Sequence, residues 1–174
     1  MRSQNENEVR ILALSGSFRS GSYNQALIRA ARELAPGYVQ IVDFDLRTVP
    51  FYDGDLEAQG DPEEVTALKE AVARADALLI ATPEYNGSVP AVLKNAIDWA
   101  SRRPPDSPLK DKPAAVMGAS PSGGGTRRAQ AYLREILDRA GADVVGEPSL
   151  YLARVFEHAT DGRLTSEDAR EAVR

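Results

Sequence analysis

Short continuous runs of hydrophobic residues alternate along this chain with longer segments in which hydrophobic residues recur every three or four positions. The first pattern predicts buried strands, and the second predicts amphipathic helices. We expect strands at residues 9–14, 38–44, 77–81, 113–119 and 143–152. The helical spacing covers residues 27–34, 65–75, 89–100 and 129–140, and the pair Thr165 and Asp168 predicts the cap of a last short helix.

The alternation of strands and helices predicts the fold class. Strands that are hydrophobic throughout fit a parallel sheet covered by helices on both faces. We therefore expect an α/β fold with a doubly wound, five-stranded parallel sheet, in a single domain spanning 1–174 with a flexible lead at 1–8 and a C-terminal tail at 153–174. The segment 45–61 is expected to be a loop. Such sheets bind ligands at the carboxyl ends of their strands, so the loops after the first, third and fourth strands are the places to search.

Composition and charge narrow the function classes. The chain has 174 residues and a net charge of −5, which disfavours a nucleic-acid partner. It has no cysteine, which excludes disulfides, thiolate nucleophiles and iron–sulfur clusters. No hydrophobic stretch approaches the roughly 18 residues of a membrane span, and the start of the chain does not resemble a signal peptide. We expect a cytoplasmic protein with no membrane partner and no metal site. The one histidine, His158, lies in the tail without neighbouring catalytic groups and is not expected to act in catalysis.

The loop after the first strand predicts a phosphate site. Residues 15–24 hold four serines, an arginine and an asparagine directly before a helix. Backbone N–H groups at a helix start, hydroxyl groups and a guanidinium are suited to a phosphate monoester. A P-loop is excluded because Ser22 and Tyr23 stand where Lys and Ser or Thr are required, and a dinucleotide fingerprint is excluded because Ser17 replaces its second glycine. A serine-capped turn without a ligand is the alternative.

The loop after the third strand, residues 82–90, suits a flat ring. Its two prolines stiffen the backbone and hold the remaining N–H and C=O groups in fixed positions. A heteroaromatic ring with polar edges could use those groups; the alternative is a turn in which Ser88 caps the next helix. Glu84 is a candidate general base, although a single carboxylate on a loop is more often solvated.

The loop after the fourth strand, residues 120–126, contains three consecutive glycines, which suits either close approach of a ligand or simple flexibility. Arg127 and Arg128 follow it; they suit a subunit interface, the phosphates of a nicotinamide cofactor or, as the favoured interpretation, plain solvation. We interpret Trp99 as a core or interface residue, and Asp43 with Asp45 as loop caps.

Taken together, three segments resemble the NADPH-dependent FMN reductase family, the flavodoxin-like group that includes bacterial chromate and quinone reductases. They are the serine-rich loop, the run from Thr82 to Arg102 with its PEYN and KNAIDW motifs, and the glycine-rich loop. The resemblance extends from Val9 to Leu152, and the tail sequence at 161–164 also looks like the end of this family.

This resemblance implies a non-covalently bound FMN and NADPH or NADH as co-substrate. The phosphate would be held by Ser17, Arg19, Ser22 and Asn24, and the flavin ring would be lined by Pro83, Glu84, Tyr85 and Asn86. The remaining expected cofactor-binding residues are Phe18, Tyr23, Ser120, Gly123 and Gly124. No side chain is expected to be catalytic, because the flavin carries the chemistry.

The expected activity is hydride transfer from NAD(P)H to FMN, followed by reduction of a quinone, free flavin, azo compound or chromate in a ping-pong cycle. The family also implies a homodimer or homotetramer. Two alternatives remain. One is a flavodoxin-like electron carrier without NAD(P)H activity. The other is a nucleotide-phosphate hydrolase, although this chain lacks the lysine of a P-loop.

Overall fold

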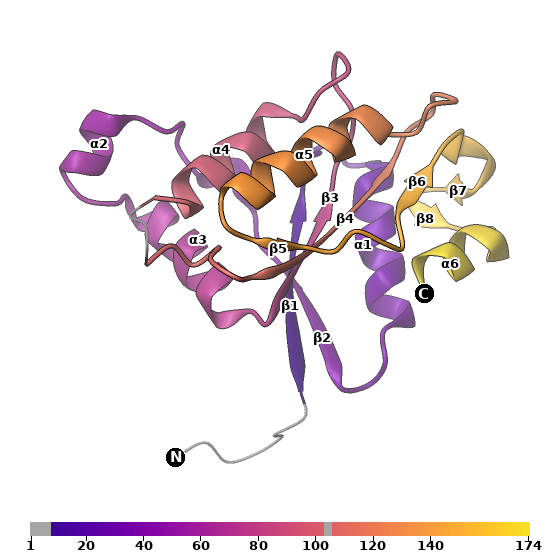
Figure 1. Ribbon diagram of the computed structural model, residues 1–174. Helices are drawn as coiled ribbons and strands as arrows, with labels where there is room; N and C mark the ends of the chain where they lie inside the picture. Colours follow the sequence, from indigo (N-terminus) through magenta and orange to yellow (C-terminus); the bar gives the residue numbers. More distant parts are fainter. Residues whose placement is uncertain (1–7, 103–105) are drawn as a thin grey trace.

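A parallel sheet forms the centre of the computed structural model, which describes residues 8–102 and 106–174 (Figure 1). Its strand order is β2-β1-β3-β4-β5. The chain therefore adds β2 on one side of β1 and then adds β3, β4 and β5 on the other side. This confirms the doubly wound topology expected from the sequence. The strands are β1 (Val9–Ser15), β2 (Val39–Asp43), β3 (Ala77–Ala81), β4 (Pro113–Ala119) and β5 (Asp143–Val144).

The fifth strand position differs from the prediction of one strand over 143–152. Two short strands, β5 and β6 (Leu150–Leu152), pair with β4 at its start and its end. The segment between them contains Gly146 and a cis peptide bond before Pro148. Proline has no N–H to donate to a sheet ladder, so regular pairing is interrupted there.

Helices cover both faces of the sheet (Figure 1). Helices α1 (Tyr23–Leu34) and α6 (Glu167–Val173) lie on one face; α3 (Glu63–Arg74), α4 (Ala91–Ala100) and α5 (Arg127–Arg139) lie on the other. Successive residues of β1 therefore face opposite cores, as the alternation of side chains along a strand requires. Leu12 and Leu14 pack with α3, α4 and α5, whereas Ala13 packs with α1. Trp99 is fully buried in the core between the sheet and α3, α4 and α5, which confirms its assignment as a core residue.

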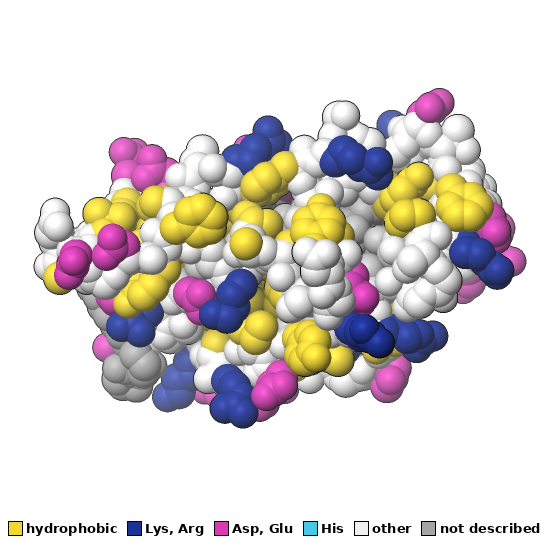
Figure 2. Space-filling view, turned by 90° about the horizontal axis from the view of Figure 1, so that it is seen from above, with side chains coloured by type: hydrophobic (Ala, Val, Ile, Leu, Met, Phe, Trp, Pro, Cys, Tyr) yellow, Lys and Arg dark blue, Asp and Glu magenta, His cyan; other side chains and the backbone are white. Residues whose placement is uncertain are grey.

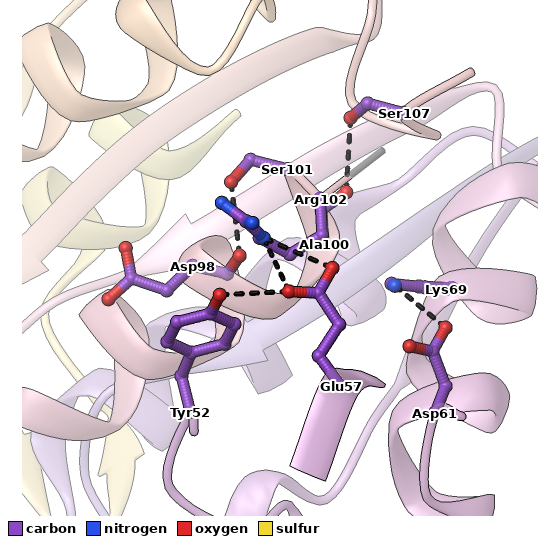
Figure 3. A network of polar contacts seen from close by, with 9 residues as sticks. All are labelled: Tyr52, Glu57, Asp61, Lys69, Asp98, Ala100, Ser101, Arg102 and Ser107. Carbon is purple, nitrogen blue, oxygen red and sulfur yellow. Dashed lines mark hydrogen bonds and ion pairs between the residues drawn. The ribbon is translucent and has the colours of Figure 1, made fainter. Parts of the chain in front are cut away.

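The segment expected to be a loop, 45–61, contains the short helices η1 (Leu46–Thr48) and α2 (Gly54–Ala58). Polar contacts hold it against α3 and α4 (Figure 3). The Tyr52 hydroxyl donates to Glu57 at 2.8 Å, Arg102 reaches the same carboxylate at 3.0 Å, and Lys69 pairs with Asp61 at 2.8 Å. The hydrogen bond from Tyr52, assisted by Arg102, lowers the pKa of Glu57, and that same bond raises the pKa of Tyr52.

The C-terminal tail folds back onto α1. It comprises η2 (Val155–Glu157), a hairpin of β7 (Ala159–Thr160) and β8 (Arg163–Leu164), and α6. Ser166 rather than Thr165 caps α6, because its Oγ accepts from the backbone N–H of Ala169 at 3.3 Å. Glu33 on α1 pairs with Arg170 at 3.0 Å, and the hydrogen bond from Arg170 holds the pKa of Glu33 below its ordinary value. Among the described residues, no helix is long and apolar enough to span a membrane.

Candidate functional site

The loops that follow β1, β3 and β4 meet at the carboxyl edge of the sheet and enclose a cavity of about 430 Å³. The sequence analysis placed the site at these three loops. The cavity is lined by Ser17, Arg19, Ser22, Tyr23, Asn24, Pro83, Glu84, Tyr85, Ala119, Ser120 and Pro121. Of the expected residues, the lining does not include Phe18, Asn86, Gly123 and Gly124, whereas Ala119 and Pro121 are additions. A larger hollow of about 590 Å³ lies between α4 and α5, where Ser101 and Gly141 mark the ends of those helices, away from these loops.

Gly16 allows the first loop to pack tightly against the others. A Cβ atom at this position would lie 2.7 Å from Pro90 Cγ and 2.8 Å from both Pro83 Cδ and Leu93 Cδ1. Contacts below 3.0 Å at three separate side chains leave no room for any residue larger than glycine. Because Gly16 has no side chain, the serine-rich loop packs directly beside the β3 loop and α4.

Helix α1 begins at the floor of the cavity. The Ser22 hydroxyl caps it by accepting from the backbone N–H of Gln25 at 3.3 Å, and both Ser17 and Ser22 are buried. A hydroxyl that accepts one hydrogen bond still has its own proton to donate. The first backbone N–H groups of a helix have no partner within it and carry its positive dipole end. This end of the cavity is therefore a set of hydrogen-bond donors.

Arg19 adds an uncompensated charge to these donors. Its guanidinium donates to the Gly21 carbonyl at 3.0 Å and lies 5.2 Å from the centre of the Tyr23 ring. Among the described residues, it forms no ion pair with a carboxylate. The arginine is thus held near the start of α1 with its positive charge free to meet an anion.

Asn24 has a role that the sequence did not reveal. Its side-chain Nδ2 donates to the Ala119 carbonyl at 3.1 Å, and its Oδ1 accepts from the Ala119 N–H at 3.0 Å. The pair joins the start of α1 to the end of β4, and the side chain is buried. These two bonds use one of the amide's two N–H donors and one of its two acceptor sites, and they fix the side chain between α1 and β4.

A tight turn shapes the loop after β3. Asn86 and Gly87 both have positive φ values, 52° and 74°, and the flanking Tyr85 and Ser88 exchange backbone hydrogen bonds of 3.1 and 3.0 Å. An Asn-Gly pair with two positive φ angles is the preferred two-residue turn of a tight hairpin. Ser88 is therefore part of this turn and does not cap α4; Pro90 occupies the cap position. The turn leaves Tyr85 53% exposed at the rim of the cavity.

The carboxylate of Glu84 is bound rather than solvated, which corrects the interpretation from the sequence. Its Oε2 accepts from the backbone N–H groups of Arg128 and Ala129, at 3.0 and 3.2 Å. These N–H groups begin α5, where Thr126 makes no side-chain cap. A negative charge at a helix N-terminus is electrostatically favourable. Glu84 therefore joins the β3 loop to α5 through its Oε2 atom.

The glycines around the loop after β4 differ in their surroundings. A Cβ on Gly118, within β4, would lie 2.0 Å from Thr126 Oγ1 and 2.5 Å from the Thr82 carbonyl, so only glycine fits. Gly125 has a φ of 63°, in the left-handed region. At Gly123 and Gly124, by contrast, an added Cβ would meet nothing within 4 Å. These two glycines border open space beside the cavity.

Figure 2 looks onto this edge of the molecule. Hydrophobic side chains cross the face in a broken band, and both basic and acidic side chains lie among and beside them. Phe18, Tyr85 and Phe156 are among the large hydrophobic residues that are exposed, at 44%, 53% and 57%. An exposed hydrophobic face with cationic side chains suits a flat aromatic ligand that carries phosphate.

Residues set aside by the sequence analysis lie elsewhere. The His158 ring shares a 2.9 Å hydrogen bond with Ser166 in the tail. Asp45 accepts from the backbone N–H of Arg47 as a cap, as predicted, whereas Asp43 pairs with Arg32 at 2.7 Å instead of capping a loop. No group of three or more potential metal ligands occurs among the residues that the structure describes.

Comparisons with known proteins agree with this site. The family model for NADPH-dependent FMN reductases matches residues 9–157. An NAD(P)H-dependent FMN reductase of Pseudomonas aeruginosa is 44% identical over 168 residues, which are 95% of this chain and 90% of the relative. A 2-hydroxy-1,4-benzoquinone reductase of a Burkholderia species is 37% identical over 94% of this chain and 89% of its own.

A solved structure supports the same relationship. The flavoenzyme FerB, an NAD(P)H:acceptor oxidoreductase from Paracoccus denitrificans, superposes with a TM-score of 0.86 at 36% identity. The match covers 95% of this chain and 91% of that one. The likeness thus extends over nearly the whole of both chains.

Proposed function

The chain belongs to the NADPH-dependent FMN reductase family, and from that premise we propose that it binds FMN in the 430 Å³ cavity, oxidises NAD(P)H and reduces a small acceptor such as a quinone. The observation that carries the proposal is the convergence of three loops on one cavity with two chemically distinct ends. One end gathers the hydroxyl groups and Arg19 at the start of α1; the other is lined by Pro83, Glu84 and Tyr85 of the β3 loop and by Ser120 and Pro121 after β4.

The residues present fit FMN. Ser17, Ser22 and Arg19, together with backbone N–H groups at the start of α1, would hold the phosphate, because anions are favoured at helix N-termini and by guanidinium groups. Asn24 would contribute through its backbone. Tyr23, whose ring lies against Arg19, would line this end. Phe18 lies between Ser17 and Arg19 in the same loop and would stand beside the phosphate end without lining it.

The ring would lie between the β3 loop, residues 83–86, and the β4 loop at Ser120, Gly123 and Gly124. The two prolines and the Asn86–Gly87 turn fix the first wall, and the bond from Glu84 to α5 holds that wall against the second. The absence of side chains at Gly123 and Gly124 leaves one approach to the ring open. Bound FMN supplies hydride transfer, which side chains cannot perform.

The chain's own residues then bind and orient the two substrates. NAD(P)H and the acceptor would use this opening in turn, as in a ping-pong cycle. The same opening would admit a quinone, free flavin, an azo compound or chromate. The proposal needs no nucleophile or general base.

Anaerobic spectroscopy tests this function. The FMN-loaded protein should lose its oxidised-flavin absorbance on addition of NADPH or NADH, and benzoquinone should restore it. A flavodoxin-like electron carrier would stay oxidised when mixed with either nicotinamide, which would contradict the proposal. Cofactor released by heat should migrate with FMN on chromatography; FAD as the main species would also count against it.

We further propose that the protein acts in the cytoplasm, where its co-substrate is made, and self-associates as a homodimer or homotetramer. Exposed aromatic residues support self-association: Tyr85 beside the cavity and Tyr132 on α5 are 53% and 52% exposed. Sedimentation at micromolar concentration provides the test, because a particle of one chain mass would contradict it.

A further inference from the structure

Two arginines at the start of α5 have no role in the site described so far. Arg127 and Arg128 are both exposed, and among the described residues neither forms an ion pair with a carboxylate. Most exposed arginines in the described chain do form one, for example Arg32, Arg102 and Arg139. Two adjacent unpaired guanidinium groups are thus unusual for this molecule.

Their position makes the lack of partners more significant. The N-terminus of a helix carries partial positive charge, so cations are disfavoured there. Glu84 supplies one negative charge, but its carboxylate bonds the backbone N–H groups of Arg128 and Ala129 and not either guanidinium. The two side chains therefore add two positive charges to a site with one compensating charge.

Contacts hold both guanidinium groups against segments that adjoin the loops around the cavity. The central carbon of the Arg127 guanidinium lies 4.5 Å from the centre of the Tyr151 ring in β6, and Tyr151 in turn lies beside Gly125 of the glycine-rich loop. Arg128 lies along the Asn86–Gly87 turn, with its Nη1 3.7 Å from the place of a Cβ on Gly87. One arginine thus stands against β6, and the other against the turn that follows Tyr85 on the cavity rim.

We propose that Arg127 and Arg128 form a second phosphate subsite, which binds the pyrophosphate or the 2′-phosphate of the nicotinamide co-substrate. The inference rests on the proposed function. In the proposed function Arg19 would hold the FMN phosphate at the start of α1. A nicotinamide stacked on the ring would direct its charged remainder toward solvent, where these two exposed arginines could meet its phosphates.

The test uses the FMN-loaded double variant Arg127→Gln/Arg128→Gln. Its KM is measured with NADPH, NADH and 1-benzyl-1,4-dihydronicotinamide, a hydride donor without phosphate, each with a quinone at saturation. A charge-assisted hydrogen bond at the weak end of its range corresponds to about tenfold in affinity. We therefore expect the KM for NADPH to rise by at least about tenfold, with little change for the phosphate-free donor.

A matched control is Arg10→Gln. Arg10 is also exposed and forms no ion pair among the described residues. It lies near the start of β1, at the end of the strands opposite the cavity. Its substitution should therefore leave every KM unchanged. A rise for NADPH alone would identify the 2′-phosphate as the bound group; equal rises for NADPH and NADH would identify the pyrophosphate.

Two results would overturn the subsite: an unchanged KM for both nucleotides, or an equal rise for the phosphate-free donor, which would indicate a general disturbance of the ring end. If the parent protein oxidises none of the three donors, the proposed function itself fails and the subsite with it. Oxidation of the phosphate-free donor by the parent therefore separates the two failures.

Discussion

Replacing Glu84 with alanine tests how the ring end of the cavity is held together. The substitution leaves the backbone N–H groups of Arg128 and Ala129 without their acceptor. Loss of a helix N-cap destabilises a protein by about 1 kcal/mol and up to about 2 kcal/mol. Because Glu84 is partly exposed, water replaces part of the lost bonding, and we expect the free energy of unfolding to fall by about 1–2 kcal/mol. Glu84→Gln keeps an acceptor without the charge and should lose about half as much.

The effect on flavin binding distinguishes this contact from an ordinary cap. Glu84 joins the β3 loop to α5, whereas the phosphate end of the cavity does not depend on it. If binding of the flavin ring weakens by the same 1–2 kcal/mol, the dissociation constants of FMN and riboflavin should both rise by the same factor, about 5- to 30-fold. The ratio of the two constants should stay at the parental value, because that ratio reports the phosphate contacts.

The assay is fluorescence titration with both flavins, beside urea unfolding of the apoprotein. Ser166→Ala is the matched control, since it removes the N-cap of α6 at the far side of α1 and should lower stability comparably. We expect its flavin affinities to equal those of the parent. Parental affinity in Glu84→Ala, or an equal loss in Ser166→Ala, would refute the positioning role of the carboxylate.

Four further substitutions test other parts of the structure. Arg19→Ala should raise the dissociation constant of FMN by about 10- to 150-fold and leave that of riboflavin unchanged in titrations, because one charge-assisted bond contributes about 1.5–3 kcal/mol; equal losses would contradict the phosphate assignment. Gly118→Ala should lower the free energy of unfolding by about 1–3 kcal/mol, since its new methyl group would overlap buried oxygens. Gly124→Val should leave stability unchanged and weaken FMN retention, and unchanged retention with unchanged kinetics would exclude a role for that loop. Glu33 has a lowered pKa through Arg170, so its stabilising effect is present above the ordinary pKa of 4.5 and is lost as the pH falls through the lowered value; Glu33→Gln should therefore unfold more easily than the parent at pH 7, with the difference disappearing in acid.

Much of the fold could be predicted because its signals are local. A strand such as 77–81, hydrophobic throughout, is required wherever helices cover both faces of a sheet, and five such runs suffice to predict the parallel architecture. The fifth strand was predicted as one strand rather than two. Whether Gly146 and Pro148 interrupt the pairing depends on which residue of the neighbouring strand each would face. Helix α2 was missed because five residues are too few to show a helical period.

The position of the site was also predictable, for a topological reason. Parallel strands end at the same edge of the sheet, so polar loops after β1, β3 and β4 had to converge. The bonds that fix those loops were not predictable. Asn24 and Ala119 are 95 positions apart, and Glu84 lies 44 and 45 positions before its two partners. Neither contact follows from a residue's own neighbours, since each depends on where two separate elements meet.

The start of α5 shows how tertiary packing overrides a local capping preference. Thr126 precedes the helix and is a residue type that commonly caps one. Its side chain is fully buried, however, and its Oγ1 accepts from Gln130 at 2.9 Å, while Gly118 provides the space that it fills. The packing of β4 against α5 thus commits the threonine elsewhere and leaves the cap to Glu84. Because that carboxylate comes from the β3 loop, the same packing that occupies Thr126 also fixes the wall proposed to hold the flavin ring.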